Sequence, residues 1–303
     1  MKSVIHVDNL HKKYGSLQAV NGISFDVDQG EIFCLLGPNG AGKTTIVECL
    51  EGLKRADGGS ARILDLNPAT QSVQLRRRIG CQLQQSALPD RIRVWEALKL
   101  FSSILNKGKD WRILQKEWGL EEKANSTFAN LSGGQRQRLL VALALVNDPE
   151  VVFLDEMTTG LDPAARHIAW NLIRSIRDQG KTVIMVTHFM DEAQMLGDRL
   201  AIIDHGQIVA MDTPQGLINL YADEKSILFT GGEEDFTWLK EIPGVQDVKL
   251  EGPTVIVSGH GPLLALVASA IVGRGIIPID LRLEQPSLED VFLKLTGHVG
   301  DQE

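Results

Sequence analysis

Short apolar runs that alternate with turns and helical stretches set the pattern of the first part of the chain. Residues 32–36, 151–154 and 182–188 are such runs, and their length and apolar character predict buried strands. Residues 46–50 and 191–196 have the spacing of helices. This alternation of strands and helices predicts an α/β domain.

A mostly helical block, from about residue 89 to residue 146, interrupts the alternation. Val94, Leu98 and Phe101 recur there at helical spacing, so we expect all three side chains to lie in a core. We predict that residues 89–146 form a helical subdomain inserted into the α/β domain.

The pattern changes again near Tyr221. Strands are predicted at residues 227–229, 245–250, 254–257 and 276–283, and helices at residues 236–241, 262–272 and 287–295. The order β-α-β-β-α-β is that of a ferredoxin-like unit, here followed by a last helix. We therefore predict two domains, residues 1–221 and a small α+β domain at residues 222–303.

Charge is distributed unevenly between these two domains. Residues 222–303 hold fourteen Asp and Glu against six Lys and Arg, which accounts for the whole net charge of −8. This asymmetry supports a separate acidic domain. It also argues against nucleic acid as a partner, because contacts to phosphates need a basic face.

Neither a membrane span nor a signal peptide is expected from the sequence. The most apolar stretch, residues 263–273, falls short of the roughly 20 residues that cross a bilayer. Cys34, Cys49 and Cys81 lack the spacing of metal ligands, and reduced cysteines fit a cytoplasmic protein. We expect the chain to lie in the cytoplasm.

A glycine-rich loop between the first buried strand and a helix carries the strongest chemical signal. It matches the pattern G-x-x-x-x-G-K-[ST] in the required context of strand, loop and helix. Glycines let the backbone approach phosphates, and the helix N-terminus adds free N–H groups. The predicted triphosphate site comprises Gly37, Pro38, Asn39, Gly40, Ala41, Gly42, Lys43, Thr44 and Thr45.

Three side chains of this loop have distinct predicted roles. Lys43 would place its ammonium group on the β- and γ-phosphates, and the Thr44 hydroxyl would ligate Mg²⁺. The Thr45 hydroxyl is placed to reach the α-phosphate.

A second anion site is predicted at the start of another helix. Ser132 is a good N-cap, and Gly133, Gly134 and Gln135 follow it. One domain does not need two triphosphate sites for one nucleotide. We infer that this second site serves a nucleotide bound to another copy of the domain.

Polar residues at strand ends supply the remaining candidates. Asp155 follows a buried strand and could hold Mg²⁺, while Glu156 could act as general base on the attacking water. His188 could sense the γ-phosphate, although a histidine at a strand end is usually structural. Gln84 or Gln85, also at a strand end, could hold Mg²⁺ or the attacking water.

Tyr14, about twenty residues before the glycine-rich loop, has two interpretations. Its ring could stack on adenine, or it could simply pack near a hairpin.

Taken in order, these features resemble the nucleotide-binding subunit of an ABC transporter over roughly residues 1–221. The resemblance implies a P-loop ABC-type ATPase domain. On the nucleotide side, it assigns Tyr14 to adenine stacking, residues 37–45 to Walker A and Gln84 or Gln85 to the Q-loop. It assigns Asp155 to Walker B, Glu156 to the role of catalytic base and His188 to that of the switch histidine. Residues 131–135 (Leu-Ser-Gly-Gly-Gln) match the signature sequence of the family, and residues 160–162 match its D-loop.

The same resemblance implies cofactors and partners. We expect ATP and Mg²⁺, a head-to-tail homodimer that sandwiches ATP, and a separate polytopic membrane permease. The subunit would then sit peripherally on the cytoplasmic face of the membrane. Met157 departs from the family, which usually has proline after the catalytic glutamate; we expect activity to survive, since that proline only shapes a turn.

The tail of the chain suggests a branch of the family. Residues 285–297 resemble the ending of daunorubicin-resistance-like export ATPases, which implies export of drugs, lipids or polysaccharide. An alternative is a soluble ABC-type ATPase that acts on a ribosome or on DNA. A P-loop kinase would not need residues 131–135, and a regulatory C-terminal domain that senses a ligand is a further alternative.

Overall fold

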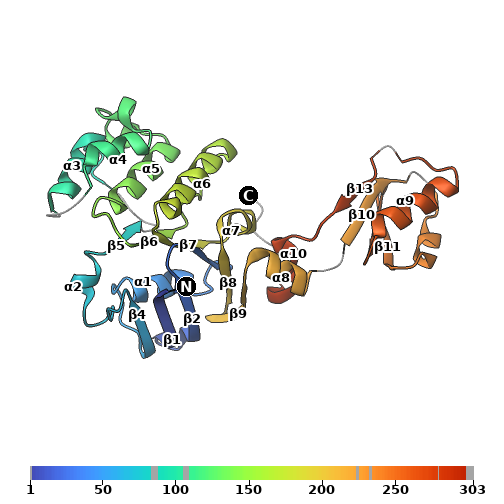
Figure 1. Cartoon of the computed structure of the whole chain (residues 1–303), viewed down its shortest axis with the longest axis horizontal. Helices are drawn as coiled ribbons and strands as arrows, with labels where there is room; N and C mark the ends of the chain where they lie inside the picture. The colour runs from blue at the N-terminus through green and yellow to red at the C-terminus, as the bar shows by residue number, and fades with distance from the viewer. Residues whose placement is uncertain are drawn as a thin grey trace. The chain divides into compact units, whose positions relative to one another are not determined.

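The structure is a computed structural model that describes residues 2–82, 88–104, 109–222, 225–231, 234–278 and 280–297. The described chain divides into two compact units, residues 2–214 and residues 215–297. Figure 1 shows the elements of each unit. The predicted boundary after Tyr221 falls at the end of helix α8 (Pro214–Tyr221) and stays a prediction.

A six-stranded sheet is the framework of the first unit. Its strand order is β5 (Ile79–Gln82), β6 (Val151–Asp155), β7 (Thr182–Thr187), β3 (Ile32–Leu36), β8 (Arg199–Asp204) and β9 (Gln207–Asp212). All neighbouring pairs are parallel except β8 and β9. The predicted buried strands are confirmed, and their carboxyl ends share one edge of the sheet.

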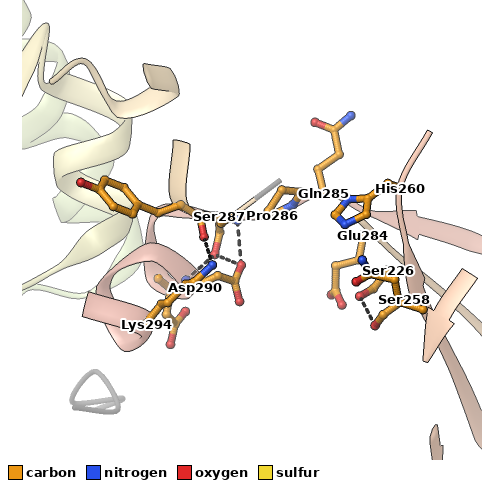
Figure 2. A pocket seen from close by; sticks show the side chains of 13 residues that line it. Ser226, Ser258, His260, Glu284, Gln285, Pro286, Ser287, Asp290 and Lys294 are labelled. Atoms are coloured by element: carbon orange, nitrogen blue, oxygen red, sulfur yellow. Dashed lines mark hydrogen bonds between the residues drawn. The ribbon is translucent and has the colours of Figure 1, made fainter. Parts of the chain in front are cut away.

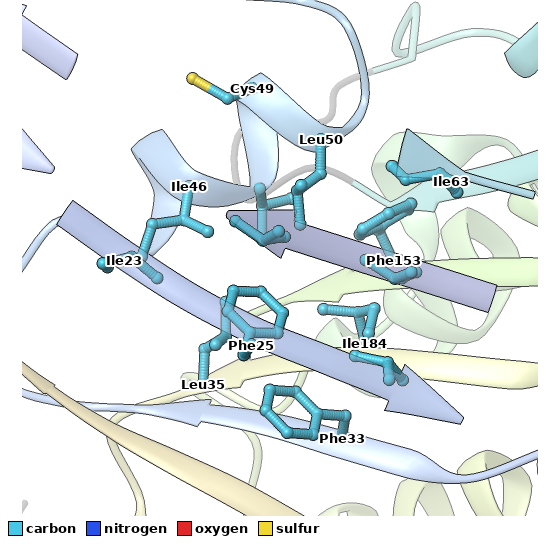
Figure 3. Close-up of a cluster of buried hydrophobic side chains, with 14 of the residues drawn as sticks. Ile23, Phe25, Phe33, Leu35, Ile46, Cys49, Leu50, Ile63, Phe153 and Ile184 are labelled. Carbon is cyan, nitrogen blue, oxygen red and sulfur yellow. The ribbon is translucent and has the colours of Figure 1, made fainter. Parts of the chain in front are cut away.

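A second, antiparallel sheet lies in the same unit. Its strands are β2 (Leu17–Asp28), β1 (Ser3–Tyr14) and β4 (Gly58–Ile63), in that order. Helix α1 (Lys43–Leu50) contributes Ile46 and Leu50 to the core that joins the two sheets (Figure 3). Phe25 stacks on Phe33 with ring centroids 5.2 Å apart. Ala41 of the glycine-rich loop belongs to the same core, which anchors the loop to both sheets.

Helices α6 (Pro163–Asp178) and α7 (Met190–Leu196) pack against the six-stranded sheet, on strands β3 and β7. Pro163 occupies the first turn of α6, and Asp162 caps the helix by accepting a hydrogen bond from Ala165 N–H at 2.9 Å.

The predicted helical block contains short and long helices. They are α3 (Val94–Ile104), α4 (Trp111–Glu117), the 3₁₀ helices η1 (Glu121–Lys123) and η2 (Phe128–Asn130), and α5 (Gly133–Ala144); the short helix α2 (Ser72–Leu75) precedes the block. Val94 and Leu98 are buried as predicted, but Phe101 is 36% exposed, so its assignment to the core is wrong. Only the first turns of α3 are covered, because Leu100 and Ile104 are also exposed.

The second unit contains a four-stranded antiparallel sheet. Its strand order is β11 (Val245–Glu251), β12 (Thr254–Gly259), β10 (Lys225–Thr230) and β13 (Arg282–Glu284). The 3₁₀ helix η3 (Thr237–Glu241) follows β10, helix α9 (Leu263–Gly273) follows β12, and helix α10 (Leu288–Thr296) ends the unit. Phe229, Phe236 and Val267 belong to its core.

The last strand is shorter than the predicted one at residues 276–283. Pro278 lacks the N–H group that a strand ladder needs. Asp280 bonds through its side chain instead, accepting hydrogen bonds from the N–H and hydroxyl groups of Thr230. Regular pairing therefore begins only at Arg282.

Candidate functional site

The glycine-rich loop is held by close backbone contacts. A Cβ atom on Gly37 would lie 2.3 Å from the Ile203 carbonyl oxygen, and one on Gly42 would lie 2.2 Å from that of Ala19. Gly42 also has a φ of +102°, which side chains other than glycine rarely adopt. These two positions require glycine, and they present the start of α1 at the loop.

Lys43 links the loop to the carboxylates at the end of β6. Its side chain is only 4% exposed, and Nζ donates hydrogen bonds to the carbonyl oxygens of Gly37 at 2.7 Å and Pro38 at 2.9 Å. Burial lowers the pKa of Lys43, while the carboxylates of Glu156 and Asp155 act to raise it. A buried ammonium beside free helix N–H groups suits the phosphates of a nucleotide.

Asp155 ends β6 with its side chain 2% exposed. Burial raises the pKa of Asp155 to about 6, although a hydrogen bond with Thr44 acts to lower it. Within the described part of the chain, Asp155 Oδ1 has no hydrogen-bond partner. A buried carboxylate oxygen without a partner, beside a threonine hydroxyl, fits the oxygen ligands that Mg²⁺ prefers.

The cost of burying Asp155 should appear in the stability of the nucleotide-free chain. Asp155→Asn should raise the free energy of unfolding at pH 8 by up to about 3 kcal/mol, since a pKa raised by about two units destabilises the ionised form by that amount. The folded chain binds a proton as pH falls through about 6, and the unfolded chain only near its ordinary pKa. The increase in the free energy of unfolding, measured by unfolding in denaturant, should therefore shrink as the pH falls from 6 to 4.

Asp178→Asn is the matched control for this measurement, because Asp178 is exposed and paired with Arg177. It should change stability little at either pH. If Asp155→Asn gave no gain at pH 8, or the same gain at pH 4, the assigned burial of an ionised Asp155 would be wrong.

Glu156 and His188 face each other where neighbouring strands β6 and β7 end. The His188 Nδ1 and Glu156 Oε1 atoms lie 3.3 Å apart, and both side chains are largely buried. Glu156 has a φ of +48°, and its N–H donates to the Val186 carbonyl oxygen at 3.0 Å. The parallel register of the two strands brings together residues 32 positions apart in the sequence.

Met157, in place of the usual proline, does not prevent the turn after Glu156. Its side chain is buried, and the turn closes through hydrogen bonds from Thr159 N–H to the Glu156 carbonyl and from Leu161 N–H to the Thr158 carbonyl. The turn therefore forms without proline, which agrees with our expectation that activity survives. That activity survives stays a prediction.

The second predicted anion site also begins a helix. Ser132 Oγ accepts a hydrogen bond from Gln135 N–H at 3.3 Å, and Gln135 Oε1 accepts one from Ser132 N–H at 3.0 Å. Ser132 caps α5, as predicted, and Gln135 completes a capping box that the sequence analysis had not identified. A cavity of about 160 Å³ is lined by residues 132–135 and 160–162, and by no residue of the loop 37–45.

The remaining candidates lie at the margins of the site. Tyr14 is 40% exposed at the end of β1, and the ammonium groups of Lys54 and Lys12 lie 5.1 Å and 5.6 Å from its ring centroid. Its role stays a prediction. Gln84 and Gln85 lie outside the described residues.

The C-terminal unit holds a separate cavity of about 800 Å³. Figure 2 shows Asp290 and Lys294 on one side of it and His260, Ser226 and Ser258 on the other. None of the residues predicted to bind ATP lines this cavity.

Comparison with known proteins identifies the fold and the site together. The sequence pattern of the ABC transporter family matches residues 20–159. The Nod factor export ATP-binding protein I of Rhizobium sp. (strain N33) is 38% identical, over 98% of this chain and 98% of its own length. The chain belongs to the ABC transporter family. The daunorubicin resistance ATP-binding protein DrrA2 of Streptomyces coeruleorubidus is 35% identical, over 97% of this chain and 95% of its own length.

Solved structures of ABC cassettes agree with this assignment. A dimeric ATP-binding cassette in a post-hydrolysis state, bound to ADP and Pi, is 26% identical with a TM-score of 0.63, covering 69% of this chain and 98% of that one. A subunit of the cbiONQ transporter complex from Clostridium perfringens is 25% identical with a TM-score of 0.65, covering 72% and 92%.

Membership of the ABC transporter family confirms the central predictions from the sequence. The chain is an ATP-binding and ATP-hydrolysing subunit, and its relatives include the export branch suggested by residues 285–297. The alternative of an ATPase that acts on a ribosome or DNA finds no support in the names of these relatives.

Proposed function

We propose that this ABC ATPase hydrolyses ATP at the carboxyl edge of its six-stranded sheet and thereby drives a separate membrane permease that exports its substrate. The observation that carries the proposal is the convergence of Lys43, Asp155, Glu156 and His188, all largely buried, beside the glycine-rich loop.

The glycine-rich loop and Tyr14 bind the nucleotide in this proposal. The backbone N–H groups of residues 39–45 surround the phosphates, and Lys43 exchanges its carbonyl partners for β- and γ-phosphate oxygens. Thr45 reaches the α-phosphate, and Tyr14 offers its exposed ring to adenine.

Glu156 is the proposed general base. It accepts a proton from the attacking water, and His188, 3.3 Å away, orients the carboxylate and contacts the γ-phosphate. Thr44 and Asp155 would hold Mg²⁺, with Gln84 as a further ligand; when bound, the ion neutralises charge on the β- and γ-phosphates.

A head-to-tail dimer would complete the site. The capped start of α5 lines a cavity separate from the glycine-rich loop, which supports its use by the nucleotide of a second copy. A dimeric cassette among the structural relatives supports the dimer, while its head-to-tail arrangement is part of our proposal.

The export function follows from the relatives' names. Those proteins are named for Nod factor export and daunorubicin resistance, and we propose an exported drug, lipid or polysaccharide as substrate. No helix among the described residues is long and apolar enough to cross a bilayer. We propose that the chain binds a polytopic permease at the cytoplasmic face of the membrane.

For the C-terminal unit we propose a ferredoxin-like fold. The strand order β11-β12-β10-β13 and the placement of η3 and α9 in sequence between the strands support this assignment.

Purification of the tagged chain from solubilised membranes, with and without ATP, tests the partner. We expect a polytopic membrane protein to copurify, because the proposed partner is a permease that binds this chain at the membrane surface. Recovery of ribosomal or DNA-associated proteins without any membrane protein would contradict the permease assignment.

A further inference from the structure

Glu192 is a buried carboxylate that the roles above do not use. It lies near the start of α7 with only 1% of its surface exposed. Trp170 of α6 donates a hydrogen bond from Nε1 to Glu192 Oε1 at 3.2 Å. Burying a carboxylate costs several kcal/mol unless nearby groups offset it, so its surroundings must stabilise it.

Two threonines share that task with Trp170. Burial raises the pKa of Glu192, while interactions with the hydroxyls of Thr187 and Thr158, and with Trp170, act to lower it. Thr158 is fully buried, and among the described residues neither its hydroxyl nor Glu192 Oε2 has a hydrogen-bond partner of normal geometry. The hydrogen bond from Trp170 is therefore the direct polar contact of this carboxylate, and the two threonine hydroxyls act on it electrostatically.

The two threonines lie in the segments that carry the proposed catalytic groups. Thr187 precedes His188, and Thr187 Oγ1 also accepts a hydrogen bond from Phe189 N–H at 3.0 Å, so both neighbours of His188 are tied together. Thr158 lies in the turn after Glu156, and its carbonyl accepts a hydrogen bond from Leu161 N–H at 3.2 Å. Helix α6, which carries Trp170, follows this turn, and helix α7, which carries Glu192, follows His188. The hydrogen bond between Trp170 and Glu192 therefore joins the helices that continue from the two segments.

We propose that Glu192 is a positioning residue for ATP hydrolysis, which holds the His188 segment and the turn after Glu156 in place through its hydrogen bond with Trp170 and its interaction with the buried hydroxyls of Thr187 and Thr158. An apolar residue of similar size could fill this space without a buried charge. An apolar residue could not accept the hydrogen bond from Trp170 that joins α6 to α7. The inference rests on the roles proposed above for Glu156 and His188.

Replacing Glu192 tests the positioning role, because kcat and KM for ATP can be measured separately. In Glu192→Ala we expect kcat for ATP to fall about tenfold or more, because small misplacement of reacting groups is costly, with KM for ATP within about twofold. Glu192→Gln keeps the acceptor for Trp170, so it should recover part of the lost kcat. Assays are run well below the midpoint of thermal unfolding of each variant.

Glu31→Ala is the matched control for loss of a buried carboxylate. Glu31 is largely buried, accepts a hydrogen bond from Asp28 N–H at 2.8 Å and pairs with Arg199, away from the proposed site. It should lower stability but leave kcat close to that of the unchanged chain. A kcat for Glu192→Ala within twofold of the unchanged chain would overturn the inference, whatever its effect on stability.

The same assay keeps this inference distinct from the proposed function. Glu156→Gln is measured alongside. If it hydrolyses ATP normally, the assignment of the base fails. If it is inactive while Glu192→Ala turns over normally, only the positioning role of Glu192 is wrong.

Discussion

Replacing Glu156 by Gln should lower kcat for ATP by about a hundredfold or more, the scale of a lost general base, while ATP affinity stays nearly unchanged. The amide cannot accept the proton of the attacking water, but it has the same size. Glu156 lies 3.3 Å from His188 and is separated in sequence from the loop 37–45, so the phosphate contacts of that loop should persist. Steady-state turnover and nucleotide binding by calorimetry measure the two effects.

The same variant should accumulate as an ATP-bound dimer. If ATP closes two copies around shared sites and hydrolysis reopens them, blocking hydrolysis stabilises the closed form. Size-exclusion chromatography with ATP measures this accumulation. Glu150→Gln, an exposed glutamate paired with Arg78, is the control and should hydrolyse ATP normally. Normal hydrolysis by Glu156→Gln would show that another group accepts the proton.

Replacing Lys43 by Ala should weaken ATP binding by about a hundredfold, as expected for the loss of charge-assisted hydrogen bonds. Lys43 is the buried cation of the loop, and its Nζ already lies within hydrogen-bond distance of Gly37 and Pro38 carbonyls. Calorimetric titration with ATP measures the loss. Lys181→Ala, which removes an ammonium paired with Asp148, is the control and should bind ATP normally. Unchanged affinity in Lys43→Ala would contradict the phosphate role.

Strand and loop patterns were sufficient to predict most of the proposed ATP site. Asp155 and His188 each follow an apolar run, and in a parallel sheet such ends share one edge. The capping role of Ser132 could be predicted because a capping box is local in sequence. Local rules also predicted the glycines that the loop requires, since Gly42 adopts a positive φ.

Features set by tertiary packing could not be predicted in this way. Phe101 has the spacing of a core residue, yet its side chain is exposed because the packed part of α3 ends before it. Glu192 looks like one of many helix-face carboxylates. The sequence indicates the burial of Glu192 only weakly, through its place in the same helical stretch as Ala193 and Leu196, which are both buried. The hydrogen-bond donor to Glu192, Trp170, lies 22 residues away in the sequence, and only the fold brings it near.

Mixing two inactive variants tests the shared-site dimer most directly. Lys43→Ala removes the phosphate lysine, and Gly133→Asp places a negative charge at the start of α5, where a Cβ meets nothing closer than 3.8 Å. Alone, each variant should be inactive because both sites of its dimer are damaged. In an equal mixture, ATPase activity should recover to about a quarter of the unchanged chain, since half of the dimers are mixed and each has one intact site. If the mixture were no more active than either variant alone, the result would contradict a site built from two copies.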